Sequence, residues 1–158
     1  MTQELPSRET SKHDRVAEAS AQTNRQLAYF ILRLTLGINI LLHGATRIGS
    51  GVGAFAPQLA QQFEKTILPR PLVLAFATVL PFTEALVGLL LCLGCLTRLA
   101  LVAGGLMTVV LVFGTALRSQ WDILTQQMVY AVIYYLLLWT LAYNRWSLDA
   151  RRRRAPDT

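Results

Sequence analysis

The sequence predicts an all-α integral membrane protein, a four-helix bundle with a short amphipathic helix in the loop between spans 1 and 2. Hydrophobic residues make up 53% of the 158 residues and charged residues only 15%, whereas about 25% of an average soluble domain is charged. Residues 1–26 hold 8 charges and residues 144–158 hold 7, so the 117 residues between them hold only 9. So few charges could not cover a soluble globule, which excludes a soluble enzyme domain, a disordered chain and a secreted disulfide scaffold.

The chain divides into a polar N-terminal tail at 1–26, a transmembrane domain at 27–143 and a basic C-terminal tail at 144–158. Residues 1–26 have no periodic apolar face, so we expect a mobile cytoplasmic tail. They are too long and too mixed in charge to begin a signal peptide, and no small-residue cleavage site follows. We therefore expect the first span to be retained.

Four stretches are long and apolar enough to cross the hydrocarbon core, which takes about 20 residues of helix. The spans are expected at about 27–46, 72–96, 99–117 and 123–143. The first span contains Arg33 and the second contains Glu84, while the third and fourth carry no charge. These two charges are the features of the membrane domain that most need a partner.

The long connection at 47–71 is where we expect the amphipathic helix. Pro57 suits the first turn of a helix, and Leu59, Phe63 and Ile67 follow at intervals of four as one apolar stripe. Such a helix lies on the membrane surface. It would act either as a lid over the bundle or as a gate to a site below.

The distribution of Lys and Arg predicts the orientation. With both termini inside, the inner segments carry ten of these residues and the outer segments four. Positive residues accumulate on the cytoplasmic side, so we expect a multi-pass protein of the bacterial inner membrane with both termini cytoplasmic. The arginines at 151–154 indicate an anchor for anionic lipids of the bilayer. Despite the net charge of +6, the chain lacks the recognition patterns of nucleic-acid binding.

Each span has one face richer in small or polar residues, and small residues let helices approach closely in lipid. At 100° per residue, the polar and ionisable side chains of the first, second and fourth spans fall on one side of their respective helices. The candidate residues for a quinone or proton site are Glu84, His43, Arg47, Gln127, Tyr130 and Tyr134, with Arg33 as a charge partner within the membrane.

Glu84 is expected to face the interior, because a charged side chain at mid-bilayer costs at least about 2.5–3.5 kcal/mol. Arg47 and His43 are its preferred partners on the outer side and Arg33 on the inner side. Glu84 then either fixes helix packing as an ion pair or serves a ligand or proton site. Ionisable residues within membranes favour the functional interpretation.

No metal site and no covalently bound cofactor are expected. The second histidine, His13, lies in the tail, so no histidine pair at helical spacing exists to ligate haem. Cys92 and Cys95 lie within an apolar helix near the reducing side, where we expect them to fill space. The sequence also shows no flavin or iron–sulfur signature.

The chain resembles the DoxX family of small four-helix membrane proteins over about residues 30–143. The first span carries the resemblance in Leu32-Arg33-Leu34, Gly37 and His43-Gly44-Ala45-Thr46-Arg47. The second span and the turn after it carry Glu84, Gly88, Leu93-Gly94 and Leu96-Thr97-Arg98-Leu99-Ala100. The family pattern covers Arg33, His43, Glu84 and Arg98, while members of the family usually have lysine where this chain has Arg47.

The resemblance implies two functions from different classes. Some DoxX relatives are the membrane subunit of a thiosulfate:quinone oxidoreductase, which suggests a quinone-interacting or redox-associated subunit. As an enzyme it would not be self-sufficient, because other protein subunits would have to supply the electrons. The alternative is a non-catalytic subunit that anchors or stabilises a larger complex, with a purely structural polar interior.

Overall fold

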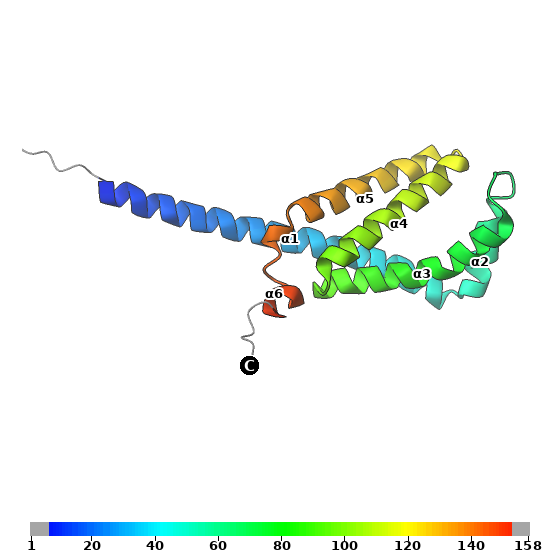
Figure 1. The fold of residues 1–158 in the computed structure, drawn as a ribbon, viewed down its shortest axis with the longest axis horizontal. Coiled ribbons are helices and arrows are strands. Elements are labelled where there is room, and N and C mark those ends of the chain that lie inside the picture. Colours follow the sequence, from blue (N-terminus) through cyan, green and yellow to red (C-terminus); the bar gives the residue numbers. More distant parts are fainter. Residues whose placement is uncertain (1–6, 153–158) are drawn as a thin grey trace, which may run out of the picture.

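The computed structural model describes residues 7–152, with side chains from residue 13 onward. The described residues form helices and turns and contain no strand, which confirms the all-α class. The elements are α1 Ser7–Gly49, α2 Val52–Gln61, α3 Arg70–Leu93, α4 Thr97–Leu117, α5 Trp121–Trp139, the 3₁₀ helix η1 Leu141–Tyr143 and α6 Leu148–Arg152 (Figure 1). Of the expected arginine cluster, Arg153 and Arg154 lie outside the described residues.

Three helices of the described chain are long and apolar enough to cross a membrane, namely α1 over His13–Gly49, α3 and α4. Helix α5 has 19 residues and is not among them. It carries Asp122, two glutamines and three tyrosines, which lower its mean hydropathy. The fourth span therefore stays a prediction.

Helix α1 is much longer than the expected span at 27–46. It runs for 43 residues without interruption, and its N-terminal half projects away from the other helices (Figure 1). We expected a mobile tail where residues 7–26 are helical. The difference has a local cause: this segment contains alanines, glutamines, glutamate and arginine, which favour a helix, and neither proline nor glycine interrupts it.

Helices α1 and α3 form an antiparallel pair that is packed through glycines. Gly44 lies against the backbone of Pro81 and Ala85, and Gly37 lies against Cys92. From α3, Gly88 lies against Leu41 and the carbonyl of Gly37. Without a side chain on these glycines, the two backbones come into direct contact, as helices do in lipid.

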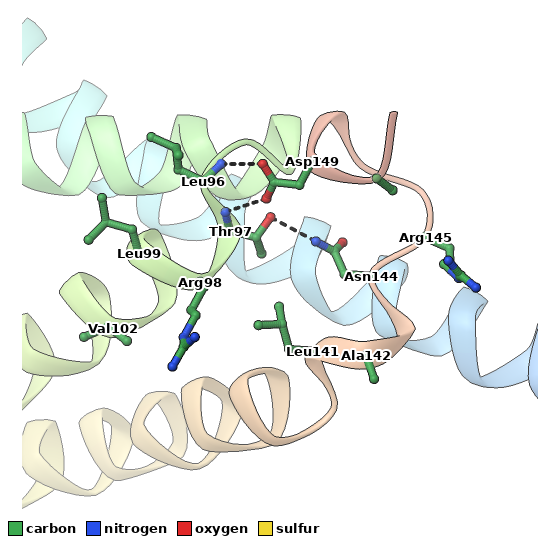
Figure 2. Close-up of a pocket in the computed structure, with 11 residues that line it drawn as sticks. Leu96, Thr97, Arg98, Leu99, Val102, Leu141, Ala142, Asn144, Arg145 and Asp149 are labelled. Carbon is green, nitrogen blue, oxygen red and sulfur yellow. Dashed lines mark hydrogen bonds between the residues drawn. The ribbon is translucent and has the colours of Figure 1, made fainter. Parts of the chain in front are cut away.

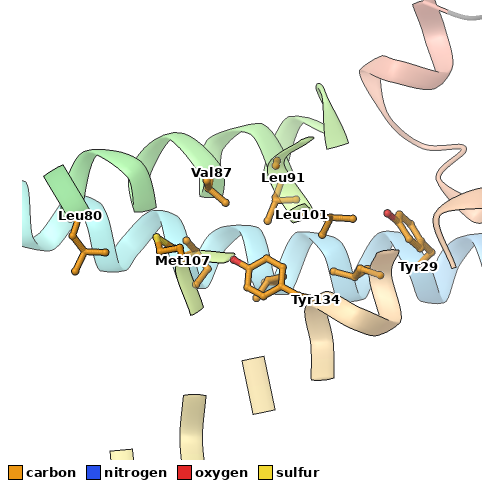
Figure 3. Packing of buried hydrophobic residues seen from close by; sticks show 11 residues of the cluster. Tyr29, Leu80, Val87, Leu91, Leu101, Met107 and Tyr134 are labelled. Atoms are coloured by element: carbon orange, nitrogen blue, oxygen red, sulfur yellow. The ribbon is translucent and has the colours of Figure 1, made fainter. Parts of the chain in front are cut away.

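The second antiparallel pair consists of α4 and α5, joined to the first pair mainly through α3. A tight turn connects α3 to α4, with Gly94 at φ 65° and Leu96 at φ 47°. The core between the pairs includes Leu91 of α3, Leu101 of α4 and Tyr134 of α5 (Figure 3). The expected second span at 72–96 therefore ends early, because the left-handed Gly94 terminates α3.

The connection between α1 and α3 contains a helix, but it begins earlier than expected. Gly51, with φ 91°, precedes α2, so Pro57 lies inside the helix and not in its first turn. The expected stripe is broken as well, since Phe63 is buried beyond the end of α2 while Ile67 is 83% exposed. The face that α2 buries is made by the small residues Ala56 and Ala60.

Candidate functional site

An ion pair between α1 and α3 is the centre of the candidate site. The Arg47 guanidinium donates to both carboxylate oxygens of Glu84. Glu84 is 3% exposed, whereas the Arg47 side chain is 29% exposed. Glu84 thus faces the interior, as expected, and its partner is the preferred one from the first span.

The register of α1 against α3 explains why Arg47 and not Arg33 reaches Glu84. Gly44 is level with Pro81 and Ala85, so the next turn of α1 places Arg47 beside Glu84. Arg33 lies 14 residues earlier on α1, which is about 21 Å along the axis. The structure therefore corrects the expected role of Arg33 as a partner of Glu84.

Arg33 instead binds backbone carbonyls where α3 ends. Its guanidinium donates to the carbonyls of Leu91 and Cys92 on α3, and over 2.8 Å to the carbonyl of Trp146. The residue is 1% exposed. The last carbonyls of a helix have no partner within it, and a cation near them is stabilised by the helix dipole. Arg33 is therefore a structural cap of α3.

The end of the molecule that carries α2 covers the ion pair. The Arg47 guanidinium lies 5.1 Å from the ring centre of Phe55 on α2, close enough for a cation–π contact. A pocket of about 210 Å³ opens beside it, lined by Thr46, Arg47, Ser50, Gly51, Ala54, Phe55 and Gln58. Helix α2 thus packs against the Arg47 side of the ion pair, while Arg47 stays partly accessible.

Arg118, which directly follows α4, contacts the segment after α2 at the same end of the molecule. It lies 4.9 Å from the ring of Phe63 and donates to the side-chain oxygen of Gln62. Burial lowers the pKa of Arg118 from its ordinary value, although a guanidinium stays protonated at neutral pH. The segment after α2 is therefore held to the end of α4 by one arginine.

The candidate residues of α5 lie on one face toward α1 and α4. Tyr130 donates to the side-chain oxygen of Asn39 on α1 at 3.0 Å. Gln127 donates to the Thr115 hydroxyl on α4, also at 3.0 Å. These contacts connect α5 to both neighbours by polar side chains.

Tyr134 lies deeper than the other two candidates of α5. It is 4% exposed, and its ring packs over Gly104, where a Cβ would clash with the ring and the hydroxyl. Among the described residues, neither the Tyr134 hydroxyl nor the Gln127 side-chain oxygen has a hydrogen-bond partner.

His43 is not brought into this group. Its side chain is exposed, and its Nδ1 lies 2.9 Å from the carbonyl of Asn39 on its own helix. His43 directly precedes Gly44 and therefore points about 100° away from it around the helix. This turns His43 out of the face that contacts α3, in which Gly44 and Arg47 lie.

The two cysteines do not form a disulfide and are half-buried. Cys92 packs beside Gly37 of α1, consistent with a space-filling role. Within residues 13–152, no three or more His, Cys, Asp or Glu side chains are placed to hold a metal ion.

The C-terminal segment forms a polar junction that was not among the expectations from the sequence. Asp149 accepts hydrogen bonds from the backbone N–H groups of Leu96 and Thr97, both at 2.8 Å, and so caps the start of α4. Asn144 donates to the Thr97 hydroxyl at 3.0 Å (Figure 2). Trp146 contributes its carbonyl to Arg33 and packs its ring against Phe30 at 5.5 Å.

A weak signal for this junction was present in the sequence. Asp149 is the one acidic residue between the last apolar stretch and the arginine cluster, and acidic side chains favour helix N-termini. Nothing in the local pattern shows, however, which N-terminus it meets. That depends on residue 149 folding back over residues 96 and 97.

A comparison with known protein families matches the part of the chain that holds the ion pair. The DoxX family model matches residues 28–116, which include Arg33, Arg47 and Glu84. This chain belongs to the DoxX family. Its multi-pass membrane character follows from this membership together with the three apolar helices. No curated protein and no solved structure matches the chain.

The DoxX match ends before α5 begins. The ion pair and the Arg33 cap of α3 therefore lie within the matched region, apart from the carbonyl of Trp146. The tyrosines of α5 and the Asp149 cap of α4 lie outside it. Chemically, the matched region supplies a buried carboxylate held by an arginine, and α5 adds phenol and amide groups beside it.

Proposed function

We propose that this DoxX family member is a subunit of a redox complex and that it binds a quinone where α5 meets α1 and α4. The observation that carries the proposal is the Tyr134 hydroxyl, which is buried and has no partner in the described part of the chain. A buried hydroxyl without a hydrogen bond costs free energy, so such groups are rare in native structures. A ligand oxygen at this position would remove that cost.

The donor set of α5 fits a quinone. A quinone has two carbonyl oxygens that accept hydrogen bonds, and it is reduced to a quinol by two electrons and two protons. The hydroxyls of Tyr134 and Tyr130 and the amide of Gln127 are the donors that would hold these oxygens. Tyr130 now donates to Asn39 and would exchange one acceptor for another.

The residues around the donors also fit an apolar ring. Leu101 and Met107 of α4 are buried in the same cluster as Tyr134, and Leu111 and Ile133 pack against it. In this proposal the electrons come from a partner subunit, because the sequence carries no haem, flavin or iron–sulfur signature. Glu84 is the one carboxylate of α3. In this proposal it would orient Arg47 and contribute a negative charge near the hydrogen-bond donors.

The experiment compares Tyr134→Phe with Tyr135→Phe after purification of the full chain from its native membrane in mild detergent. Tyr135 is the adjacent residue but is 62% exposed, so its variant is a matched control. We expect extracted quinone in the wild type and in Tyr135→Phe, and a loss of most of it in Tyr134→Phe at unchanged protein yield. Equal quinone content in both variants, or none in the wild type, would overturn the proposal.

A second candidate function is a non-catalytic subunit that stabilises a larger complex. The observation in its favour is that both Glu84 oxygens are already bound by Arg47, so the pair needs no ligand to be satisfied. The glycine contacts between α1 and α3 likewise serve packing alone. In that case, protein subunits bind the exposed apolar faces of the helices.

In this proposal α5 is the fourth span of a four-helix bundle, α2 lies on the outer membrane face, and both termini are cytoplasmic in a bacterial inner membrane. The tryptophans support this arrangement, because Trp121 and Trp139 stand exposed at the two ends of α5. Tryptophan concentrates at both membrane interfaces. The basic C-terminal segment then faces the anionic leaflet.

A further inference from the structure

A second pocket lies at the α3–α4 end of the molecule, between the start of α4 and the C-terminal segment. It has a volume of about 730 Å³. Its lining residues are Leu96, Thr97, Arg98, Leu99, Val102, Leu141, Ala142, Asn144, Arg145, Asp149 and Ala150 (Figure 2). None of them belongs to the quinone site proposed above.

Two arginines give the pocket its charge. Arg98 extends from the first turn of α4 and Arg145 from the C-terminal segment, with Leu141 and Ala142 between them (Figure 2). Both side chains are exposed. Within the described part of the chain, neither guanidinium takes part in a hydrogen bond or an ion pair.

The acidic group of the pocket offsets this charge only in part, because one carboxylate, that of Asp149, stands against two guanidinium groups. Both carboxylate oxygens of Asp149 accept hydrogen bonds from the N–H groups of Leu96 and Thr97. Asn144 is bound to the Thr97 hydroxyl, but its side-chain oxygen is buried without a partner among the described residues. The pocket therefore keeps a net positive charge from its two arginines and one aspartate.

The remaining lining is apolar and continues along a membrane helix. Leu99 is 61% exposed and Val102 is 41% exposed, one turn apart at the beginning of the apolar helix α4. Leu106 continues the same side of α4 and is also exposed. An apolar track that starts beneath two arginines matches a molecule with an anionic head and hydrocarbon chains.

We infer that this pocket binds one anionic phospholipid. Its phosphate lies between Arg98 and Arg145, and one acyl chain follows Leu99 and Val102. The site differs from a general attraction of the C-terminal arginines to the membrane, because it needs a defined pocket. It is also independent of the quinone proposal, since it lies at the opposite end of α4 from Thr115 and Gln127.

The test uses the full chain, purified in mild detergent and delipidated, and counts bound lipid by native mass spectrometry. Phosphatidylglycerol is the probe, and phosphatidylcholine and glycerol 3-phosphate are the comparisons. We expect one phosphatidylglycerol per chain, bound at least tenfold more tightly than phosphatidylcholine. Arg98→Gln combined with Arg145→Gln should weaken its binding about thirtyfold, which follows from the usual contribution of an arginine near an anionic surface.

The matched control is Arg151→Gln combined with Arg152→Gln. It removes the same amount of charge, here from the C-terminal segment alone, but neither residue lines the pocket. We expect less than a threefold change. An equal loss of lipid in both double variants would overturn the proposed site and favour a diffuse attraction to the C-terminal arginines. If glycerol 3-phosphate competed as effectively as the lipid itself, the pocket would not recognise an acyl chain, which would also overturn the inference.

A third variant keeps the inference testable if the loss of two arginines prevents folding. Val102→Trp fills the apolar track without changing the charge, at a position already exposed on α4. We expect it to lose phosphatidylglycerol as well. Full retention of the lipid by Val102→Trp would overturn the inference.

Discussion

Gly88 determines how closely α3 approaches α1. A Cβ at this position would lie 2.6 Å from the Cα of Leu41 and 2.8 Å from the carbonyl oxygen of Gly37. Both atoms belong to the backbone, so no side-chain rotation can relieve the contact. The helices would have to move apart, and the Arg47–Glu84 pair spans that same interface.

We expect Gly88→Ala to lower the free energy of unfolding by about 1–3 kcal/mol, as overpacking does in other cores. Gly105→Ala is the control, because its Cβ would meet only Tyr134, at an ordinary 3.9 Å. That variant should be neutral or slightly stabilising. Thermal unfolding in detergent measures both, and equal midpoints for the two variants would contradict the close packing.

Glu84→Gln tests the ion pair itself. The variant leaves the Arg47 guanidinium without its carboxylate, and we expect a loss of about 1.5–3 kcal/mol, typical of a hydrogen bond to a charged group. Arg47→Lys keeps the cation and should lose less. A Glu84→Gln protein of unchanged stability that no longer transfers electrons would instead assign Glu84 to the redox site.

At the scale of elements, the start of α4 depends on a residue more than fifty positions away in the chain. Leu96 precedes α4 in a left-handed conformation, and its own side chain provides no cap. Asp149 supplies that cap from the C-terminal segment. The turn between α3 and α4 is therefore complete only when the C-terminal segment is docked.

Asp149→Ala should destabilise the protein by about 0.5–2 kcal/mol, the usual cost of losing an N-terminal cap. The control is Asp122→Ala, which removes an exposed carboxylate from the first turn of α5 and should change stability less. The difference in unfolding midpoint between the two variants measures the cap. A smaller effect of Asp149→Ala than of Asp122→Ala would show that this cap contributes nothing.

The elements differ in how far their sequence determines them. Glu84 was predicted to face the interior because the cost of a charge at mid-bilayer disfavours the lipid side. Residues 7–26 were predicted as a tail because a polar helix without an apolar face has no periodic signal. The start of α2 was predicted too late because Gly51, and not Pro57, sets it.

For the whole molecule, membrane topology depends on α5. The ten-to-four distribution of Lys and Arg favours cytoplasmic termini only if α5 crosses the membrane as a fourth span. Reporter fusions after residues 120 and 158 separate the possibilities. We expect a reporter active only in the periplasm to work at 120 and fail at 158, whereas the same result at both positions would mean that α5 does not cross.

The candidate site was predictable in its composition but not in its pairings. Arg47 was one of three expected partners of Glu84, together with His43 and Arg33, and the structure selects it. The carbonyl partners of Arg33 could not be predicted, because one of them, Trp146, is 113 positions away in a segment expected to be a tail. Pairings of this kind depend on the antiparallel register of α1 and α3, which the glycine contacts determine and a single sequence does not reveal.

The docked C-terminal segment also has a consequence for biosynthesis. Domains generally fold from the N-terminus during translation, so α1 and α3 meet while residues 144–152 are still inside the ribosome. During that interval Arg33 lacks the carbonyl of Trp146, and the start of α4 lacks Asp149. The protein therefore reaches its mature packing only after residues 144–152 have emerged from the ribosome, and a nascent chain stalled before that point would expose an incomplete α3–α4 turn to the quality-control proteases of the membrane.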